Sequence, residues 1–526
     1  MLTTLAAPAF AGTWYIEDGD ITVKAGETEG TNKVSQGANQ EVEDTDTIIK
    51  NREDTASSNT VTIDAGSDKV EVTLKDVNID TSSRNKAAVS VTGSGNTTIK
   101  LDGDNHLTGG NGIYSNSSGS LTISGDENDS LTAQGGDSRN GIYSVSGDVT
   151  ISGGTVTATG GNSTGSYGSG GDGIHSGSLT VSGGTVNANG GNSGNGTYSG
   201  GGDGIASGSL TVSDGTVNAK GGNCGNGNYS DGGNGISSSG SLTISGGTVD
   251  AKGGNSGNGN YSAGGNGIDN GGRSGSITIS GGTVDAKGGN SGTGDYSNGG
   301  SGICNGGRSG SITISGGTVN AAGGNDGNGN YSYGGSGIHS VSGSIDLSGS
   351  LELTAKAGSS NGKALSQNGK ELDLDTIKDK LDPGAKVTTN ANGETKEVSI
   401  PRPVEPEGPV IPEESSSSSD GGSAAPSAPA SPLPGLTVTD KDGQRISYTS
   451  TQSGNTLTVC VGRFTASFRI SLAALRQLRA EGIETIAFQT ILCSTTLSVD
   501  ELLAMGGEDA EAVLTHRLTD SSLTVG

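Results

Sequence analysis

The stretch Ser178-Leu179-Thr180-Val181-Ser182-Gly183-Gly184-Thr185-Val186-Asn187-Ala188 carries the pattern that decides the fold. Near copies follow a Gly-Ile pair that recurs along the chain, with its isoleucine at positions 113, 142, 174, 205, 236, 268, 303 and 338. A period of about 32 residues is typical of a solenoid or another repeat array. Because a solenoid presents each surface residue again on the next turn, we expect a functional site to be a row of residues.

Each repeat predicts three short strands. The Gly-Ile segment forms the first, residues 178–182 the second and residues 185–188 the third. In the second strand Leu179 and Val181 alternate with Thr180, the period of a half-buried strand. Gly-Gly and Ser-Gly pairs supply the turns. Stacked in register, these strands predict a parallel β-helix that rises about 4.8 Å per turn. The rest of each repeat, such as residues 221–233, is a loop that we expect to project from one edge.

Changes in composition divide the chain into four parts. Met1–Ala11 ends in the small-x-small signal Ala9-Phe10-Ala11 after an apolar run, which predicts the remnant of a secretory signal peptide. Nine of the eleven prolines fall within 401–435, which indicates a linker. The expected parts are a signal remnant at 1–11, a β-helix with terminal caps at 12–400, a Pro/Ser-rich linker at 401–435 and a small α+β domain at 436–526.

The C-terminal part predicts a conventional core with two helices. Three of the four phenylalanines lie there, and a helix is expected from Leu472 to Glu481. Ser498 with Glu501 has the spacing of a capping box before a second helix. Cys460 and Cys493 share this domain, and whether they pair stays open, since four cysteines in 526 residues are no disulfide framework.

Charge and hydropathy narrow the range of partners. A formal net charge of −26 excludes the basic footprint that nucleic-acid binding requires. No run beyond the N-terminus is long and apolar enough for a membrane span, so no membrane insertion is expected. An acidic surface suits divalent cations or neutral ligands. We expect a secreted or cell-surface monomer.

One tyrosine recurs in every long loop. Stacked one per turn, these rings would form a row with nearly the roughly 5 Å spacing of sugars in an extended glucan, close to the strand spacing. The row therefore predicts a polysaccharide-binding face. In the alternative interpretation each ring packs across its own loop and fastens it to the next. The residues are Tyr167, Tyr198, Tyr229, Tyr261, Tyr296 and Tyr331.

Asparagine and aspartate form further rows. Asn192, Asn223, Asn255 and Asn290 follow a Gly-Gly pair, where stacked amides can hydrogen-bond to one another. Asp172 and Asp203 precede successive Gly-Ile pairs, so their carboxylates would lie one turn apart and repel unless one is protonated or a cation intervenes. Calcium is the cation predicted there, and in the acidic loop with Asp126 and Asp129. A solvated carboxylate pair is the alternative.

Indications of catalysis are few. The four histidines are scattered without zinc spacing or a triad partner. Arg273 and Arg308 occupy equivalent places in successive repeats, and a basic residue beside calcium is the arrangement of polysaccharide lyases on β-helices. Two solvated loop arginines are the alternative. The chain is therefore expected to be no enzyme, with lyase activity kept as an alternative.

The repeated Gly-Asp-Gly-Ile and Leu-Thr-Ile-Ser-Gly-Gly-Thr-Val motifs, with Asn105–Gly110 and Leu121–Gly125, resemble the carbohydrate-binding β-helix proteins of clostridial cell surfaces. The resemblance covers roughly residues 55 to 355. It implies a secreted, right-handed parallel β-helix like that of pectate lyases, which binds calcium and plant cell-wall polysaccharide. The enlarged Asn/Gly/Tyr loops of this chain depart from the family's pattern. We predict a non-catalytic, calcium-stabilised carbohydrate-binding protein; the alternatives are a polysaccharide lyase and a surface adhesin or spacer.

Overall fold

The computed structural model describes residues 11–401 except 360, and residues 435–525 except 441–443, 447, 454, 462, 464, 491–493, 506–509 and 517–520. Most of the predicted signal remnant and linker, and Cys493, lie outside the described residues. Contacts divide the chain into two compact units, Met1–Pro406 and Glu407–Gly526.

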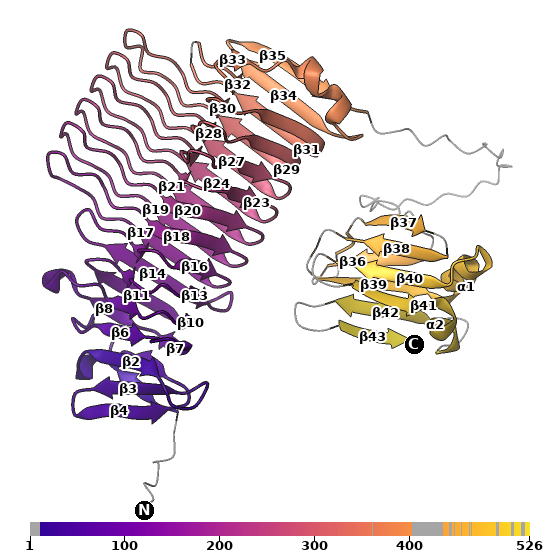
Figure 1. Ribbon diagram of the computed structural model, residues 1–526, viewed down its shortest axis with the longest axis horizontal. Coiled ribbons are helices and arrows are strands. Elements are labelled where there is room, and N and C mark those ends of the chain that lie inside the picture. Colours follow the sequence, from indigo (N-terminus) through magenta and orange to yellow (C-terminus); the bar gives the residue numbers. More distant parts are fainter. Residues whose placement is uncertain are drawn as a thin grey trace, which may run out of the picture. The chain divides into compact units, whose positions relative to one another are not determined.

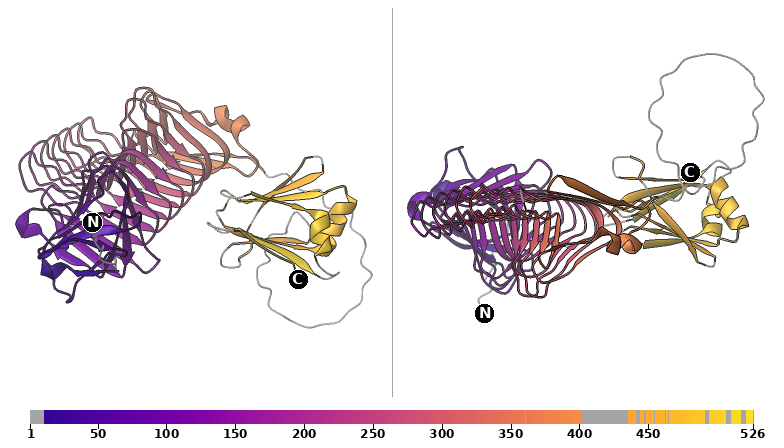
Figure 2. Two further views of the ribbon diagram at one scale, coloured as in Figure 1. Left: turned by 60° about the horizontal axis from the view of Figure 1, so that its bottom comes forward. Right: turned by 90° about the horizontal axis from the view of Figure 1, so that it is seen from above.

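The first unit is a parallel β-helix, as the repeat predicts. Thirty-five strands form one continuous hydrogen-bonded system (Figure 1). Successive turns pair in parallel and in register, so that Val186 lies beside Val217, and Val217 beside Val249. The views in Figure 2 show the turns stacked one on another. Equivalent residues of successive repeats therefore form rows along the solenoid.

The strands occupy three columns. The Gly-Ile column holds β2 (Ile21–Ala25), β6 (Val61–Asp64), β9 (Val89–Thr92), β12 (Ile113–Ser115), β15 (Ile142–Ser144), β18 (Ile174–Val181), β20 (Ile205–Val212), β22 (Ile236–Ser238), β25 (Ile268–Asn270), β28 (Ile303–Asn305), β30 (Ile338–Ser340) and β32 (Leu365–Gln367). The second column holds β1 (Thr13–Tyr15), β5 (Ile48–Lys50), β7 (Val70–Lys75), β10 (Thr97–Asp102), β13 (Leu121–Ser124), β16 (Asp148–Ile151), β23 (Leu242–Ile244), β26 (Ile277–Ile279), β29 (Ile312–Ala322) and β31 (Ile345–Lys356). The third holds β8 (Asn78–Asp80), β11 (Asp104–Gly109), β14 (Ser130–Gly135), β17 (Thr155–Thr159), β19 (Thr185–Asn189), β21 (Thr216–Lys220), β24 (Thr248–Lys252), β27 (Thr283–Lys287) and β34 (Lys386–Ala391).

Some strands continue from one column into the next. The separate first and second strands predicted for the repeat at Ile174 are one strand, β18, and β20 is continuous in the same way. Likewise β29 and β31 run through the second and third columns. The repeat pattern weakens after Ile338, yet β31 pairs with β29 through both columns, with one register shift between Ile314 and Gly316.

Antiparallel strands cover both ends of the solenoid. At the start, β3 (Asn32–Gln36) and β4 (Asn39–Asp44) form a meander on β2. At the end, β33 (Lys370–Glu371) pairs with β32, and β35 (Glu394–Ser399) with β34. Three short 3₁₀ helices complete the unit: η1 (Ile16–Asp18), η2 (Ser82–Arg84) and η3 (Leu374–Lys380). The atypical terminal turns act as caps, as solenoids require.

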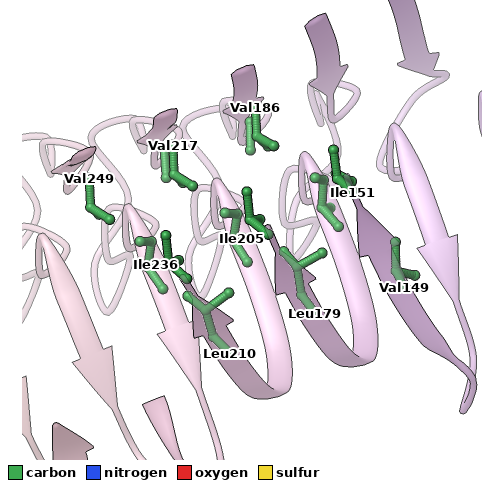
Figure 3. Packing of buried hydrophobic residues seen from close by; sticks show 14 of the residues in the cluster. Val149, Ile151, Leu179, Val186, Ile205, Leu210, Val217, Ile236 and Val249 are labelled. Atoms are coloured by element: carbon green, nitrogen blue, oxygen red, sulfur yellow. The ribbon is translucent and has the colours of Figure 1, made fainter. Parts of the chain in front are cut away.

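The core is a narrow stack of aliphatic rows. Leu179, Val186 and Ile205 are fully buried, and Figure 3 shows such side chains pointing toward one another from neighbouring turns. The polar residues between them face outward, in agreement with the predicted alternation. Burying one aliphatic side chain stabilises the fold by about 1.5–3 kcal/mol, and each turn repeats that contribution.

The described residues of the second unit form two four-stranded sheets, in the strand orders β36-β39-β42-β43 and β37-β38-β40-β41, and two helices. Its strands are β36 (Leu436–Thr439), β37 (Thr449–Ser453), β38 (Thr456–Cys460), β39 (Ala466–Ser471), β40 (Thr485–Gln489), β41 (Ser494–Ser498), β42 (Glu511–His516) and β43 (Ser521–Val525). The predicted helices are present as α1 (Leu472–Ala480) and α2 (Val499–Ala504), and the Ser498 hydroxyl caps α2 by accepting a bond from the Glu501 amide. Phe468 and Phe488 are buried in its core.

Candidate ligand-binding face

The long loops lie in register and form a stacked edge of the solenoid, visible in Figure 1 as parallel traces beside the strands. Glycine is required where their backbones meet. A Cβ built on Gly254 would lie 1.9 Å from the carbonyl oxygen of Gly222 in the preceding turn. Loop backbones this close leave no room for side chains between turns, so the side chains that the loops do carry form rows on their surface.

The loop tyrosines form one continuous column of rings, which we call the tyrosine column. Neighbouring ring centroids from Tyr198 to Tyr331 lie 4.9–5.0 Å apart with planes within 12° of parallel. Tyr167 extends the column at 6.4 Å. This is offset stacking. Ring faces inside the column therefore cover one another, and a sugar ring has no space between them.

The column nevertheless meets solvent along its length. The side chains are 46–73% exposed, so ring edges and hydroxyl groups are accessible to a ligand. The stacked rings connect each loop to the next, which the alternative interpretation expects. Their exposed edges are also accessible to a polysaccharide, as the binding interpretation requires. The predicted ligand set thus lies together in one surface row.

Every tyrosine of the column has a left-handed backbone. Their φ angles run from +56° to +71°, a region that favours glycine or asparagine and costs other residues about 1–2 kcal/mol. Four of the tyrosine amides, from Tyr198 to Tyr296, donate to carbonyls of the following turn, as Tyr229 does to Asn260 at 2.9 Å. Stacking returns about 0.5–1.5 kcal/mol per ring pair. A tyrosine repeatedly placed where glycine would be unstrained indicates that the ring itself matters.

Asparagine rows support the column from within the loops. The side-chain oxygen of Asn223 accepts a bond from the Asn255 amide at 2.8 Å, and Asn255 does the same for Asn290. In this row the backbone amide of one turn therefore donates to the side-chain oxygen of the preceding turn, and the stacked side chains do not bond to one another as expected. A serine row adds hydrogen bonds within each loop: the hydroxyls of Ser193, Ser256 and Ser291 donate to the carbonyl six residues later. Cys224 occupies the equivalent position and donates its thiol to the Ser230 carbonyl.

The Asx row before the Gly-Ile pairs has the same backbone-capping role. Asp172 Oδ1 accepts from the Asp203 amide at 2.8 Å, and Asp203 Oδ1 from the Asn234 amide at 2.6 Å. The other oxygen of Asp172 lies 2.9 Å from His175 Nδ1. Burial, with the Asp172 carboxylate nearby, raises the pKa of Asp203 to about 7. The hydrogen bond to Asp172 raises the pKa of His175.

The second predicted calcium location is a hydrogen-bonded turn. Asp129 Oδ2 accepts from the Asp126 amide at 2.7 Å and its Oδ1 from the Gly103 amide at 2.9 Å, so both oxygens already bind backbone. Among the described residues no group of three or more His, Cys, Asp or Glu side chains is arranged to hold a metal ion. Calcium binding at Asp126, Asp129, Asp172 or Asp203 stays a prediction.

A second aromatic row escaped the sequence analysis. Tyr114, Tyr143 and His175 directly follow three successive Gly-Ile pairs and lie in register. Their ring centroids are 5.7 and 5.1 Å apart, in tilted and edge-on arrangements. Tyr114 also lines a polar groove of about 340 Å³ together with Lys86 and Arg139. The sequence does contain a signal for this row, because an aromatic residue directly follows three successive Gly-Ile pairs.

Further along the same row stand Asp269 and Cys304, in register on β25 and β28. Burial and the Asp269 carboxylate raise the pKa of the Cys304 thiol, which opposes the thiolate form that nucleophilic catalysis needs. Arg273 and Arg308 are exposed and lie at the corners between the first and second columns. Each follows a member of this row, Asp269 or Cys304, a few residues later in the sequence. No described ion pair involves either arginine.

No protein-family description, curated protein or solved structure matches this chain. The fold is therefore established by the structure alone. Within the residues that the structure describes, no helix has the length and apolar character needed to cross a membrane.

Proposed function

We propose that this protein is a secreted, non-catalytic carbohydrate-binding protein that holds a polysaccharide along the β-helix axis at the tyrosine column. The observation that carries the proposal is the 4.9–5.0 Å repeat of exposed phenol groups. It is close to the roughly 5 Å rise of an extended glucan and to the strand spacing itself. Each turn then meets one sugar in the same way.

The mode of binding follows from the covered ring faces. Phenol edges and hydroxyls, with the exposed amides of neighbouring loop asparagines, supply hydrogen bonds and edge contacts. Each contact is weak, but several on one chain act together and raise the overall affinity by multivalency. The clostridial cell-surface proteins that the sequence resembles favour a plant cell-wall polysaccharide, and calcium as a stabilising ion belongs to the same proposal.

The test is retention on insoluble polysaccharides, with and without a chelator. The variant Tyr229→Asn/Tyr261→Asn/Tyr296→Asn removes three rings, while asparagine accepts the left-handed backbone. Replacing the same residues with phenylalanine keeps the stack and removes only the hydroxyls, so this variant separates edge contacts from hydroxyl hydrogen bonds. Retention by the native chain and its loss in the asparagine variant support the proposal. Retention on no glycan by a correctly folded native chain contradicts it, and binding to a protein ligand instead would favour an adhesin.

A polysaccharide lyase is the second candidate, and the titration of Asp203 favours it. A carboxylate with a pKa near 7 beside His175 and Asp172 is suited to acid–base work at neutral pH. Release of unsaturated, ultraviolet-absorbing sugars from pectins that disappears in Asp203→Asn would support this activity. If Asp203→Asn still released these sugars and Arg273→Ala did not, the catalytic residues would lie at the corner that contains Arg273.

A further inference from the structure

The tyrosine column concentrates oxidisable groups on the surface. Its six phenols are 46–73% exposed, whereas the Trp14 indole and the Cys224 and Cys304 thiols are buried. A one-electron oxidant in solution therefore reaches these phenols directly. Tyr229, Tyr261 and Tyr296 each have another phenol ring 4.9–5.0 Å away on both sides.

From this juxtaposition we propose that the tyrosine column is an oxidative cross-linking site, where hydrogen peroxide acting through a haem peroxidase joins neighbouring tyrosines of one chain as dityrosine. The product would bond one loop covalently to the next. This inference does not depend on carbohydrate binding.

The reaction balances with peroxide as the only oxidant. Each of two phenols loses one electron and one proton to give a phenoxyl radical. The two radicals form a carbon–carbon bond between ring positions ortho to the oxygens, and the hydrogens at those positions move to restore both phenols. Peroxide takes up the two electrons and two protons, so two tyrosines and one H₂O₂ give one dityrosine and two waters.

The column geometry favours coupling within a chain. The centroids of Tyr229 and Tyr261 are 5.0 Å apart with planes 3° apart, so each phenol is held beside one fixed partner. A group held beside its partner has an effective concentration of the order of millimolar or more, so intrachain coupling exceeds interchain coupling about a thousandfold at micromolar protein. Tyr114 and Tyr143, at 5.7 Å with planes 49° apart, are a less favourable pair.

Two variants with equal numbers of tyrosines test the proposal, because phenylalanine keeps the stack but is not oxidised by the peroxidase. The contiguous variant, Tyr167→Phe/Tyr198→Phe/Tyr331→Phe, leaves Tyr229, Tyr261 and Tyr296 adjacent. The alternate variant, Tyr198→Phe/Tyr261→Phe/Tyr331→Phe, leaves three tyrosines that are each separated by a phenylalanine. Full-length proteins are treated at micromolar concentration with horseradish peroxidase and limiting H₂O₂.

Dityrosine is measured by its blue fluorescence and by peptide mass spectrometry. Cleavage at Lys220, Lys252, Arg273, Lys287 and Arg308 places Tyr229, Tyr261 and Tyr296 on separate tryptic peptides, so that each linkage is identified by the loss of two hydrogens. We expect linked 229–261 and 261–296 peptides from the native chain and the contiguous variant. Total dityrosine should be at least about tenfold lower in the alternate variant, because its remaining phenols lack an oriented neighbour. Equal yields from the two variants, or cross-links only between chains, would overturn the proposal.

Discussion

Asp203 Oδ1 accepts a hydrogen bond from the backbone amide of Asn234, one turn further along the solenoid, at 2.6 Å. In the following turns Asn234 and Asn266 make the same bond with neutral side chains. Asp203 thus performs a structural task that does not require its charge. Its ionisation is opposed by burial and by the carboxylates of Asp172 and Asp269.

We therefore expect Asp203 to make the β-helix less stable as pH rises. The pKa of this group is 3.8 unfolded and about 7 folded, so between these values the folded state holds a proton that the unfolded state lacks. The free energy of unfolding falls through this window by about 1.4 kcal/mol per pH unit at most. Asp203→Asn should remove the fall and be more stable than the native chain at pH 8, with little difference near pH 4.

Denaturant unfolding at pH 4, 6 and 8 measures this effect. His175 needs a control, because its raised pKa gives a contribution that is present below about pH 6.5 and is also lost as pH rises. His175→Gln should leave the Asp203 contribution in place. A parallel pH dependence in the native chain and in Asp203→Asn would contradict the assignment.

Substitutions at Tyr261 should separate stacking from backbone strain. Phenylalanine keeps the ring and should change the free energy of unfolding by less than about 0.5 kcal/mol. Alanine loses two stacking contacts and keeps the left-handed strain, for an expected loss of about 1–3 kcal/mol. Asparagine should be more stable than alanine by about 1 kcal/mol because it tolerates a φ of +57°. If alanine and asparagine are equivalent in thermal unfolding, the backbone argument is wrong.

Cys224 should be replaceable by serine but not by alanine. Its thiol donates to the Ser230 carbonyl in the place where Ser193, Ser256 and Ser291 donate their hydroxyls. Cys224→Ser should preserve or slightly raise stability. Cys224→Ala leaves a buried carbonyl without this donor and should cost about 1 kcal/mol. Thermal melts of the two variants provide the measurement, and equal melting temperatures would show that the bond contributes nothing.

We expect calcium to act at the pair Asp172 and Asp203 and not in the acidic loop at Asp126. Added calcium is expected to raise the melting temperature of the native chain at pH 8, since it would relieve the repulsion between the two carboxylates. Asp172→Asn/Asp203→Asn should abolish that shift, whereas Asp126→Asn should retain it. A shift that survives the double substitution would place the ion elsewhere.

The strands and their rows were predictable because two periods coincide in the sequence. Alternation in Leu179-Thr180-Val181 sets the inward face, and the Gly-Ile spacing sets which residues stack. What those residues bind within the stack was not predictable. The tyrosines have a left-handed backbone, and the side-chain oxygens of Asn223 and Asn255 accept bonds from backbone amides. Both features depend on the distance between neighbouring loops, which cannot be read from the sequence of one repeat.

The Tyr114–Tyr143–His175 row shows a different limit. The row changes from tyrosine to histidine at its third member and does not recur in every repeat, so the sequence analysis did not single it out, although all three residues follow a Gly-Ile pair. The groove beside Tyr114 draws Lys86 from one turn and Arg139 from another. Residues that come together through stacking, without a shared motif, can be located only after the register of the turns is known.

The corner between the Gly-Ile column and the second column differs in length from turn to turn. Three residues, Ser239–Ser241, join β22 to β23, whereas six, Gly271–Ser276, join β25 to β26. The strands on either side remain in register despite the longer connection. This corner is thus a natural graft position: a guest peptide inserted at Arg273 and again at Arg308 would be displayed twice on successive turns, whose strands lie about 4.8 Å apart.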